Sequence, residues 1–334
     1  MARESSPASA FKMCPSCRGL IDRNASVCPL CGSAVRPARA RGSSNSESNR
    51  ILGIIPIPGT ATAILFAVNI AMFGITWYLS QVAASNEAGS AFSLNIDPNV
   101  VLSLGAKRGF EVLYRGQWWR LVTAMFLHLG LLHIFMNMWC LIDLGPMVES
   151  LFTKTKFIVL YLVTGVFGFL LSTVMSPGNP RIGDPGGMSA GASSPILGLI
   201  GILIGVSFHH GGMGRIYRSQ LWRWVIYILA LGIIFPFDNW AHIGGVVSGL
   251  ALGYLVPEGE PETRRAELLW SSLSILSVLI IAGSFALMAL NLNPGLKLIC
   301  RPRSRWRRPS LSLLPALNYP FPRHCPNSTA AGPY

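Results

Sequence analysis

The chain has polar ends and a long apolar middle, which is divided into runs of helix-forming length. Seven predominantly apolar runs of about 15 or more residues occur, against about 20 residues for an ideal membrane-spanning helix. The runs are 60–80, 131–148, 157–174, 193–208, 221–235, 241–256 and 268–290. The shorter ones need flanking apolar residues or a thinner bilayer to span it. The pattern predicts an all-α polytopic membrane protein.

The segment 81–130, between the first two runs, is too long for a simple connection. It is partly apolar and contains Gly116-Gln-Trp-Trp-Arg120. We expect it to form an interfacial subdomain.

Composition agrees with a membrane protein. Of 334 residues, 51% are hydrophobic and 12% charged, about half the charged share of a soluble globular protein. The net charge of +13 lies mainly in the tails, since residues 1–50 carry 8 Lys and Arg against 3 Asp and Glu, and residues 294–334 carry 7 against none. The balanced charge between the tails gives no indication of nucleic-acid binding.

The first 50 residues are polar and do not follow the pattern of a secretory signal peptide, so we expect the N-terminus in the cytoplasm. This orientation puts Lys154, Lys156, Arg215, Arg218 and Arg223 on the inner side, as positively charged inner loops favour. The seven cations of the C-terminal tail conflict with it if all seven runs span. We expect a multi-pass protein of the cell (cytoplasmic) membrane.

Four of the seven cysteines form two pairs near the N-terminus, Cys14-Pro-Ser-Cys17 and Cys28-Pro-Leu-Cys31. Two such turns can direct four thiolates at one zinc ion, as in zinc ribbons. Two disulfides or four free thiols are the alternative, which a cytoplasmic location disfavours. The spacing predicts a structural zinc site, with a possible role in recruiting a cytoplasmic partner.

The chain is therefore expected to have five parts. Residues 1–35 form the zinc-ribbon-like segment, 36–51 a disordered linker, 52–257 the membrane core, 258–293 a loop and a candidate seventh helix, and 294–334 a basic disordered tail.

Four polar residues in the apolar core indicate chemistry, because unpaired polar groups in hydrocarbon are costly. Ser193, His242, His133 and Asn137 lie near the starts of the even-numbered runs, so we expect them at one depth near the outer surface. A serine beside a neutral histidine can perform acyl transfer. The pattern predicts Ser193 as nucleophile and His242 as base, with His133 and Asn137 donating to the oxyanion.

Asp238 precedes His242 by four residues and is expected outside the helix, so we predict a dyad rather than a triad. His128 is interpreted as an interfacial residue. Gly198 and Gly201 in the fourth run, and Gly245, Gly249 and Gly253 in the sixth, have the small-residue spacing that lets two helices approach closely.

These residues resemble the rhomboid intramembrane serine proteases over about residues 52–257. The shared motifs are Gly191-Ala-Ser193, Ala241-His242 followed by Gly245 and Gly249, His133 with Asn137, Trp119-Arg120, and the stretch 144–149 that ends in Glu149. The resemblance implies a six-helix core, no cofactor for catalysis, a lipid bilayer as the site of action and transmembrane proteins as substrates. It also implies that Arg120 and Glu149 are structural.

The sequence departs from the family at Ser194-Pro195, where glycine usually follows the nucleophile. The added side chain would narrow the site or offer a competing hydroxyl. A catalytically silent rhomboid-like binding or chaperone protein is therefore the alternative function. A transporter would need charges facing a midplane pathway, whereas Asp143 and Arg223 lie toward the inner ends of their runs.

Overall fold

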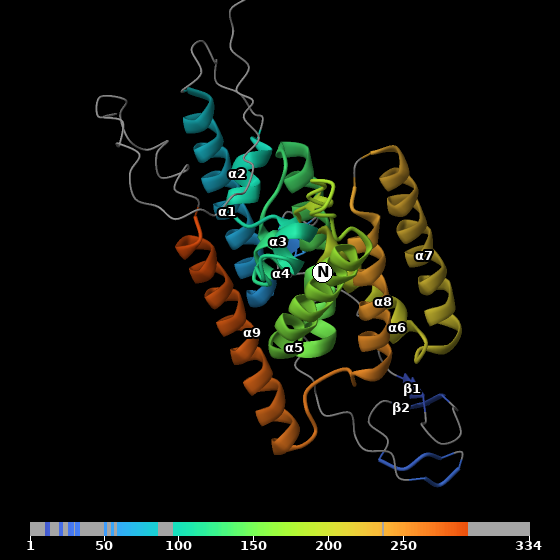
Figure 1. Ribbon diagram of the computed structural model, residues 1–334. Coiled ribbons are helices and arrows are strands. Elements are labelled where there is room, and N and C mark those ends of the chain that lie inside the picture. The colour runs from blue at the N-terminus through green and yellow to red at the C-terminus, as the bar shows by residue number, and fades with distance from the viewer. Residues whose placement is uncertain are drawn as a thin grey trace, which may run out of the picture.

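The computed structural model describes residues 11–13, 20–22, 26–29, 31–33, 50–51, 55–56, 59–85, 96–235 and 237–292 (Figure 1). This part of the chain is mostly helical. Its helices are α1 (Thr60–Ser85), α2 (Pro98–Ser103), α3 (Gly109–Leu113), α4 (Arg120–Thr123), the 3-10 helix η2 (Ala124–Phe126), α5 (Leu131–Met175), α6 (Ser193–Ser207), α7 (Gly211–Ile234), α8 (Asn239–Leu255) and α9 (Arg264–Leu290). Its strands form antiparallel pairs: β1 (Phe11–Met13) with β2 (Leu20–Asp22), β3 (Arg50–Ile51) with β4 (Ile55–Pro56), and β5 (Lys107–Arg108) with β6 (Met188–Ser189).

Each predicted apolar run corresponds to a helix, and α5 contains two of them. A straight helix of 45 residues would be about 68 Å long, roughly twice the apolar thickness of a bilayer. The backbone breaks at Thr153, which has a left-handed φ of 68°. The helix therefore consists of two segments joined by a sharp break.

The two segments of α5 run in opposite directions. A Cβ atom on Gly191 would lie 2.8 Å from the ring of His133, in the first segment. A Cβ atom on Gly165, in the second, would lie 3.2 Å from Pro195 Cβ. Since His133 and Gly165, on the two sides of Thr153, both lie beside residues 191–195, the chain reverses at Thr153.

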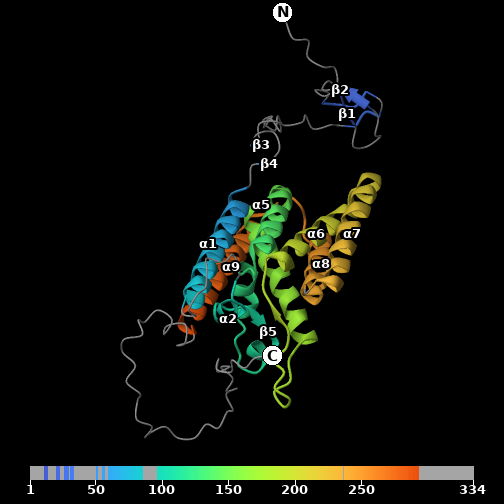
Figure 2. The same ribbon diagram turned by 90° about the horizontal axis from the view of Figure 1, so that it is seen from above.

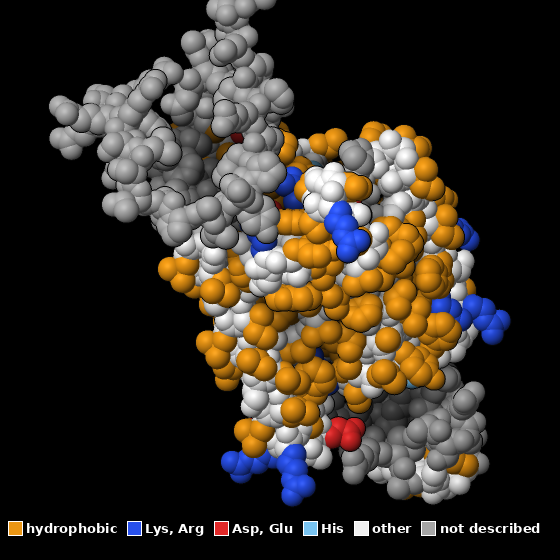
Figure 3. Space-filling model, in the orientation of Figure 1, with side chains coloured by type: hydrophobic (Ala, Val, Ile, Leu, Met, Phe, Trp, Pro, Cys, Tyr) orange, Lys and Arg blue, Asp and Glu red, His pale blue; other side chains and the backbone are white. Residues whose placement is uncertain are grey.

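Among the residues that the structure describes, three helices are long and apolar enough to cross a membrane, namely Thr60–Ala83 within α1, α5 and α9, and α6 is a shorter apolar helix. Apolar side chains cover most of the face seen in Figure 3, with Lys and Arg side chains mainly toward its margins. The chain is thus a multi-pass membrane protein.

Helices α6 and α8 touch through their backbones along a line of glycines. A Cβ atom on Gly249 would collide with the Gly198 carbonyl, and one on Gly201 with the carbonyl of Val246. Small residues permit this close approach. The start of α6 is thereby held against the start of α8, on the side of the bundle away from α1 and α9 (Figure 2).

The segment between α1 and α5 folds into short helices around Arg120. The guanidinium of Arg120 donates hydrogen bonds to the carbonyls of Leu102 (2.6 Å) and Ala106 (2.9 Å), and to Gln117 Oε1 (2.6 Å). Burial lowers the pKa of Arg120 to about 10. The side chain therefore ties α2 to the residue before β5, because one guanidinium nitrogen donates to both the Leu102 and the Ala106 carbonyls.

Glu149 of α5 caps the start of α1 from another part of the chain. Its carboxylate accepts hydrogen bonds from the backbone N–H groups of Ala61 (3.0 Å) and Thr62 (2.9 Å) and from Thr62 Oγ1 (2.7 Å). First-turn N–H groups have no partner within their own helix, and the helix dipole favours an anion there. A Cβ atom on Gly59 would collide with this carboxylate, so a residue without a side chain precedes the helix.

Only part of the predicted zinc segment lies within the described residues. Cys14 and Cys17 lie outside them. Cys28 and Cys31 stand on a tight turn in which Gly32 N–H donates to the Cys28 carbonyl (2.9 Å) and Gly32 has a φ of 70°. The basic tail 294–334 and most of the linker 36–51 also lie outside the described residues.

We predict that Glu149→Ala destabilises the fold, because it leaves two buried N–H groups of α1 without an acceptor. The free energy of unfolding should fall by about 2 kcal/mol or more. Thermal or denaturant unfolding in detergent measures this change. The matched control Glu262→Ala removes an exposed carboxylate and should change stability by less than about 0.5 kcal/mol. Equal stability of the two variants would contradict the capping role.

Candidate active site

Ser193 and His242 meet where helices α6 and α8 begin. Ser193 is the first residue of α6, and His242 lies in the first turn of α8. Ser193 Oγ is 2.9 Å from His242 Nε2. The imidazole is buried, with 4% of its surface exposed, whereas Ser193 is partly exposed. A hydroxyl in this position can donate its proton to a neutral imidazole.

The chain reaches Ser193 through a sharp turn at Gly191. Strand β6 ends at Ser189, and Gly191 follows with a φ of 139°, a region that strongly favours glycine. The Gly191 N–H donates to the Ala124 carbonyl (2.8 Å) and so ties the turn to η2. A side chain at Gly191 would also meet the His133 ring. Position 191 therefore favours glycine for two reasons: the turn has a backbone conformation that side chains disfavour, and a side chain there would clash with His133.

His133 lies on the same side of Gly191 as the serine hydroxyl. A Cβ atom on Gly191 would be 2.8 Å from His133 Nε2 and 3.6 Å from Ser193 Oγ. His133 is partly exposed, and Leu129 N–H donates to its Nδ1 at 3.4 Å. The structure thus brings this ring next to the dyad, where its Nε2 can face a substrate oxygen.

Asn137 lies one turn farther along α5 and is buried. Its Nδ2 donates to the His133 carbonyl at 2.8 Å. An amide group carries two N–H donors, so this bond leaves one for a ligand. Its contact with the helix backbone orients the side chain.

His128 is fully buried in the protein, and its ring lies 5.2 Å from that of His133 in an edge-to-face arrangement. Burial, together with the neighbouring His133, holds the pKa of His128 well below its ordinary value. The neutral His128 ring packs against the ring of His133. In the sequence, only the five-residue spacing between His128 and His133 could have indicated that the two rings lie close together.

Asp238 is the N-cap of α8 and does not contact the imidazole. Its Oδ1 accepts a hydrogen bond from the Ala241 N–H at 3.0 Å. Within the described residues, His242 Nδ1 is buried and has no hydrogen-bond partner. The geometry is therefore that of a serine–histidine pair without a third carboxylate.

Ser194 points away from the dyad into the packing between α5 and α8. It is fully buried, and its Oγ donates to the carbonyls of Gly165 and Ala241, each at 3.3 Å. A Cβ atom on Gly168 would collide with this hydroxyl. This placement disagrees with both effects that the sequence suggested. The Ser194 side chain does not narrow the space beside Ser193, and its hydroxyl does not compete with that of Ser193.

Across the ranges that the structure describes, no group of three or more His, Cys, Asp and Glu side chains could hold a metal ion. The polar groups beside Ser193 are hydrogen-bond donors and acceptors. Their chemistry suits acyl transfer by side chains.

Residues 115–258 match the rhomboid domain family. RHOMBOID-like protein 6, mitochondrial, of Arabidopsis thaliana is 33% identical over 159 residues, 46% of this chain and 48% of that protein. RHOMBOID-like protein 7 of Arabidopsis thaliana is 31% identical over 175 residues, 50% of this chain and 52% of that protein. Rhomboid protease GluP of Bacillus subtilis is 32% identical over 154 residues, 45% of this chain and 28% of that protein.

The chain thus spans about half the length of the two plant relatives and less of the bacterial protease. The matched region contains Ser193, His242, His133 and Asn137. These comparisons support the rhomboid family for this chain, and the family match covers residues 115–258.

Proposed function

We propose that this protein is an intramembrane serine endopeptidase that cleaves transmembrane segments of membrane proteins through a Ser193–His242 dyad. The observation that carries the proposal is the 2.9 Å contact between Ser193 Oγ and His242 Nε2. The contact joins two helix starts in a multi-pass membrane protein whose relatives include a protein named as a rhomboid protease. The proposed core comprises α1, both segments of α5, α6, α7 and α8, with α9 as a seventh span.

In the first step, His242 Nε2 takes the proton of Ser193 while Oγ attacks the scissile carbonyl carbon. The resulting tetrahedral intermediate collapses when the C–N bond breaks, and protonated His242 gives its proton to the leaving amine. The product is an acyl-enzyme on Ser193. In the second step, water loses a proton to His242 and attacks the acyl carbon; the bond between that carbon and Ser193 Oγ then breaks, and His242 returns the proton to Oγ.

The oxyanion of both intermediates needs donors. We assign this role to His133 Nε2, the second N–H of Asn137 and the Ser193 backbone N–H. The neighbouring His133 and Gly191 support the assignment, because the ring and Ser193 Oγ lie on one side of that glycine. Loss of one such donor typically costs about 100- to 1,000-fold in rate.

The substrate must present an extended backbone at the dyad, because a helical peptide has its carbonyls paired. We propose transmembrane segments with a helix-destabilising residue near the outer membrane surface. Water enters from the same side, since Ser193 and His133 are partly exposed.

We place the protein in the cell membrane with its N-terminus in the cytoplasm, on the basis of the Lys and Arg positions. RHOMBOID-like protein 6 of Arabidopsis thaliana is named as mitochondrial, and RHOMBOID-like protein 9 of the same plant, 27% identical over 199 residues, as chloroplastic. In any of these membranes, the proposed dyad lies at the side of the bilayer opposite the helix break at Thr153.

The sharpest test of the dyad is cleavage of a model transmembrane substrate in liposomes. Ser193→Ala and His242→Ala should each lower the cleavage rate by about a thousandfold or more, since nucleophile and base act as one unit. The matched control is Ser194→Ala, which removes an adjacent hydroxyl that faces the α5–α8 contact.

Ser194→Ala should keep most of the wild-type cleavage rate. Cleavage that depends on Ser194 and persists in Ser193→Ala would contradict the dyad. A folded wild-type protein that cleaves no member of a substrate panel, yet retains membrane proteins in a pull-down, would favour the silent binding or chaperone function.

We also propose that Cys14, Cys17, Cys28 and Cys31 bind a structural zinc ion and that this segment engages a cytoplasmic partner. The tight turn at Cys28 and Cys31 supports the proposal, because it places two thiols on one short loop. Zinc would hold the segment folded by joining its two cysteine pairs. It has no part in peptide cleavage.

The purified full chain should contain about one zinc per molecule by elemental analysis. Cys28→Ser should lose the metal because it removes a thiolate ligand. Cys140→Ser, which alters a cysteine in α5, should retain it. Zinc content near zero in the wild type after incubation with zinc would contradict the site.

A further inference from the structure

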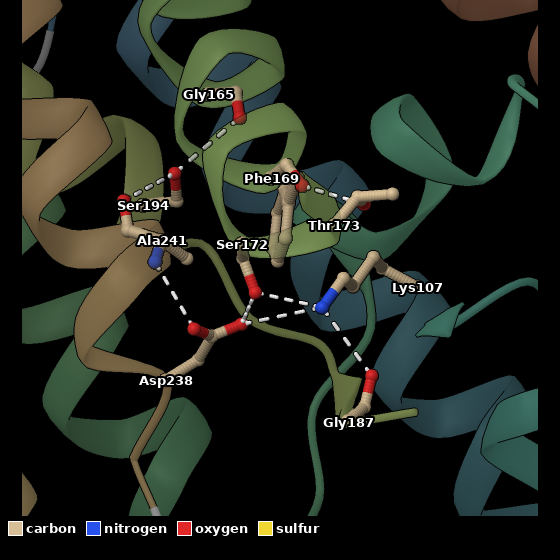
Figure 4. A network of polar contacts seen from close by, with 9 residues as sticks. All are labelled: Lys107, Gly165, Phe169, Ser172, Thr173, Gly187, Ser194, Asp238 and Ala241. Atoms are coloured by element: carbon tan, nitrogen blue, oxygen red, sulfur yellow. Dashed lines mark hydrogen bonds and ion pairs between the residues drawn. The ribbon is translucent and has the colours of Figure 1, made fainter. Parts of the chain in front are cut away.

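A buried lysine connects the two chain segments that deliver the dyad. The side chain of Lys107 in β5 is 1% exposed. Its Nζ donates to Ser172 Oγ (2.7 Å) and to the Gly187 carbonyl (3.3 Å), and lies 3.9 Å from Asp238 Oδ2 (Figure 4). Ser172 Oγ in turn donates to Asp238 Oδ2 at 2.5 Å. We call Lys107, Ser172 and Asp238 the Lys107 network.

Asp238 connects this network to the helix that carries His242. Its Oδ1 accepts from the Ala241 N–H, and its backbone carbonyl accepts from the His242 N–H at 3.1 Å. The carboxylate thus fixes the first turn of α8. Since Oδ2 faces Ser172 and Lys107, one carboxylate joins α8 to the second segment of α5 and to β5.

The backbone of Lys107 connects the same network to Ser193. Lys107 pairs with Ser189 in the two-stranded sheet of β5 and β6. Four residues after Ser189 the chain reaches Ser193. Lys107 therefore makes two connections. Its backbone pairs with β6, the strand that precedes Ser193, and its side chain contacts Asp238, the N-cap of the helix that carries His242.

Net stability is a poor explanation for this arrangement. Burial lowers the pKa of Lys107, and the Asp238 charge only opposes that effect. Taking two charges out of water costs free energy that their attraction often fails to offset, so apolar replacements of buried ion pairs are frequently neutral or stabilising. The network does provide directed hydrogen bonds among three segments, and these fix geometry.

We propose that Lys107, Ser172 and Asp238 are positioning residues that set the distance and direction between Ser193 and His242. The inference rests on the proposed function of the dyad. Asp238 acts through the backbone of α8, because its carboxylate oxygens are engaged by Ala241, Ser172 and Lys107. It is not a third catalytic residue on the imidazole.

The test measures the second-order rate at which a fluorophosphonate probe reacts with the full chain in detergent. An activated serine attacks phosphorus and releases fluoride, so the rate reports the dyad without a peptide substrate. Thermal unfolding of each variant is measured in parallel. Cleavage of a model transmembrane substrate gives kcat and KM.

Two single variants separate charge from capping. Asp238→Asn keeps an N-cap acceptor for Ala241 but removes the anion, and Lys107→Met removes the cation at similar length. Each should lower the labelling rate by about 10- to 100-fold, because small misplacements of reacting groups have effects of this size. In cleavage, kcat should fall while KM stays near its wild-type value.

The double variant Lys107→Met with Asp238→Asn distinguishes positioning from stability. Each single variant leaves one buried charge without its partner, which should lower the melting temperature. The double variant leaves neither charge, so its melting temperature should lie closer to the wild-type value. The labelling rate should remain low, because the directed contacts are still missing. Ser172→Ala, a milder change, should lower labelling by about three- to tenfold with the ion pair intact.

Matched controls lie away from the dyad. Lys156 is also buried and donates to two carbonyls, those of Pro257 and Gly259, and Thr263 is the N-cap of α9. Lys156→Met and Thr263→Ala should change labelling by less than about twofold at equal folding.

Wild-type labelling in the folded double variant, or in both Asp238→Asn and Ser172→Ala, would overturn the positioning role. A wild-type protein that the probe does not label would instead contradict the proposed dyad itself. The two failures are therefore distinguishable.

Discussion

The close contact between α6 and α8 is the constraint on which the rest of the site depends. In a bilayer, apolar surface gives no preference for one helix over another, so packing and hydrogen bonds determine which helices meet. Glycines such as Gly201 and Gly249 let these two backbones touch, because a Cβ atom at either position would collide with the backbone of the other helix. Ser193 and His242 both lie in the first residues of their helices. Their separation is therefore set by a contact between rigid backbones rather than by a flexible loop.

Polar side chains repeatedly satisfy the backbone groups that helix ends leave unpaired. Glu149 accepts from the first turn of α1, Arg120 donates to carbonyls of the segment before α3, and Asp238 caps α8. Each joins segments that are distant in sequence or caps a helix at the site. In a low-dielectric environment such bonds have few competitors. They turn an apolar bundle, which could pack in several registers, into one with defined helix ends.

The sequence predicted the helices and the meeting of Ser193, His242 and His133, because apolar runs mark helices and alternate spans begin on one side. It could not predict the orientation of Ser194, since that depends on how α6 is rotated against Gly168. It did not predict the burial of His128 within the protein, which follows from the course of the segment before α5. Lys107 and Ser172 are 65 residues apart, and no local pattern connects them. Cys14, Cys17 and the whole basic tail 294–334 lie outside the described residues, so the zinc-ribbon and tail predictions stay predictions.

The identity of the activated serine is the most direct measure of this account. The chain offers two adjacent hydroxyls, of which Ser193 faces a histidine and Ser194 faces backbone carbonyls. Peptide mapping by mass spectrometry of the fluorophosphonate-treated protein in membranes identifies the residue that carries the adduct. The account predicts a single adduct on Ser193. An adduct on Ser194, or none in a folded protein, would contradict it.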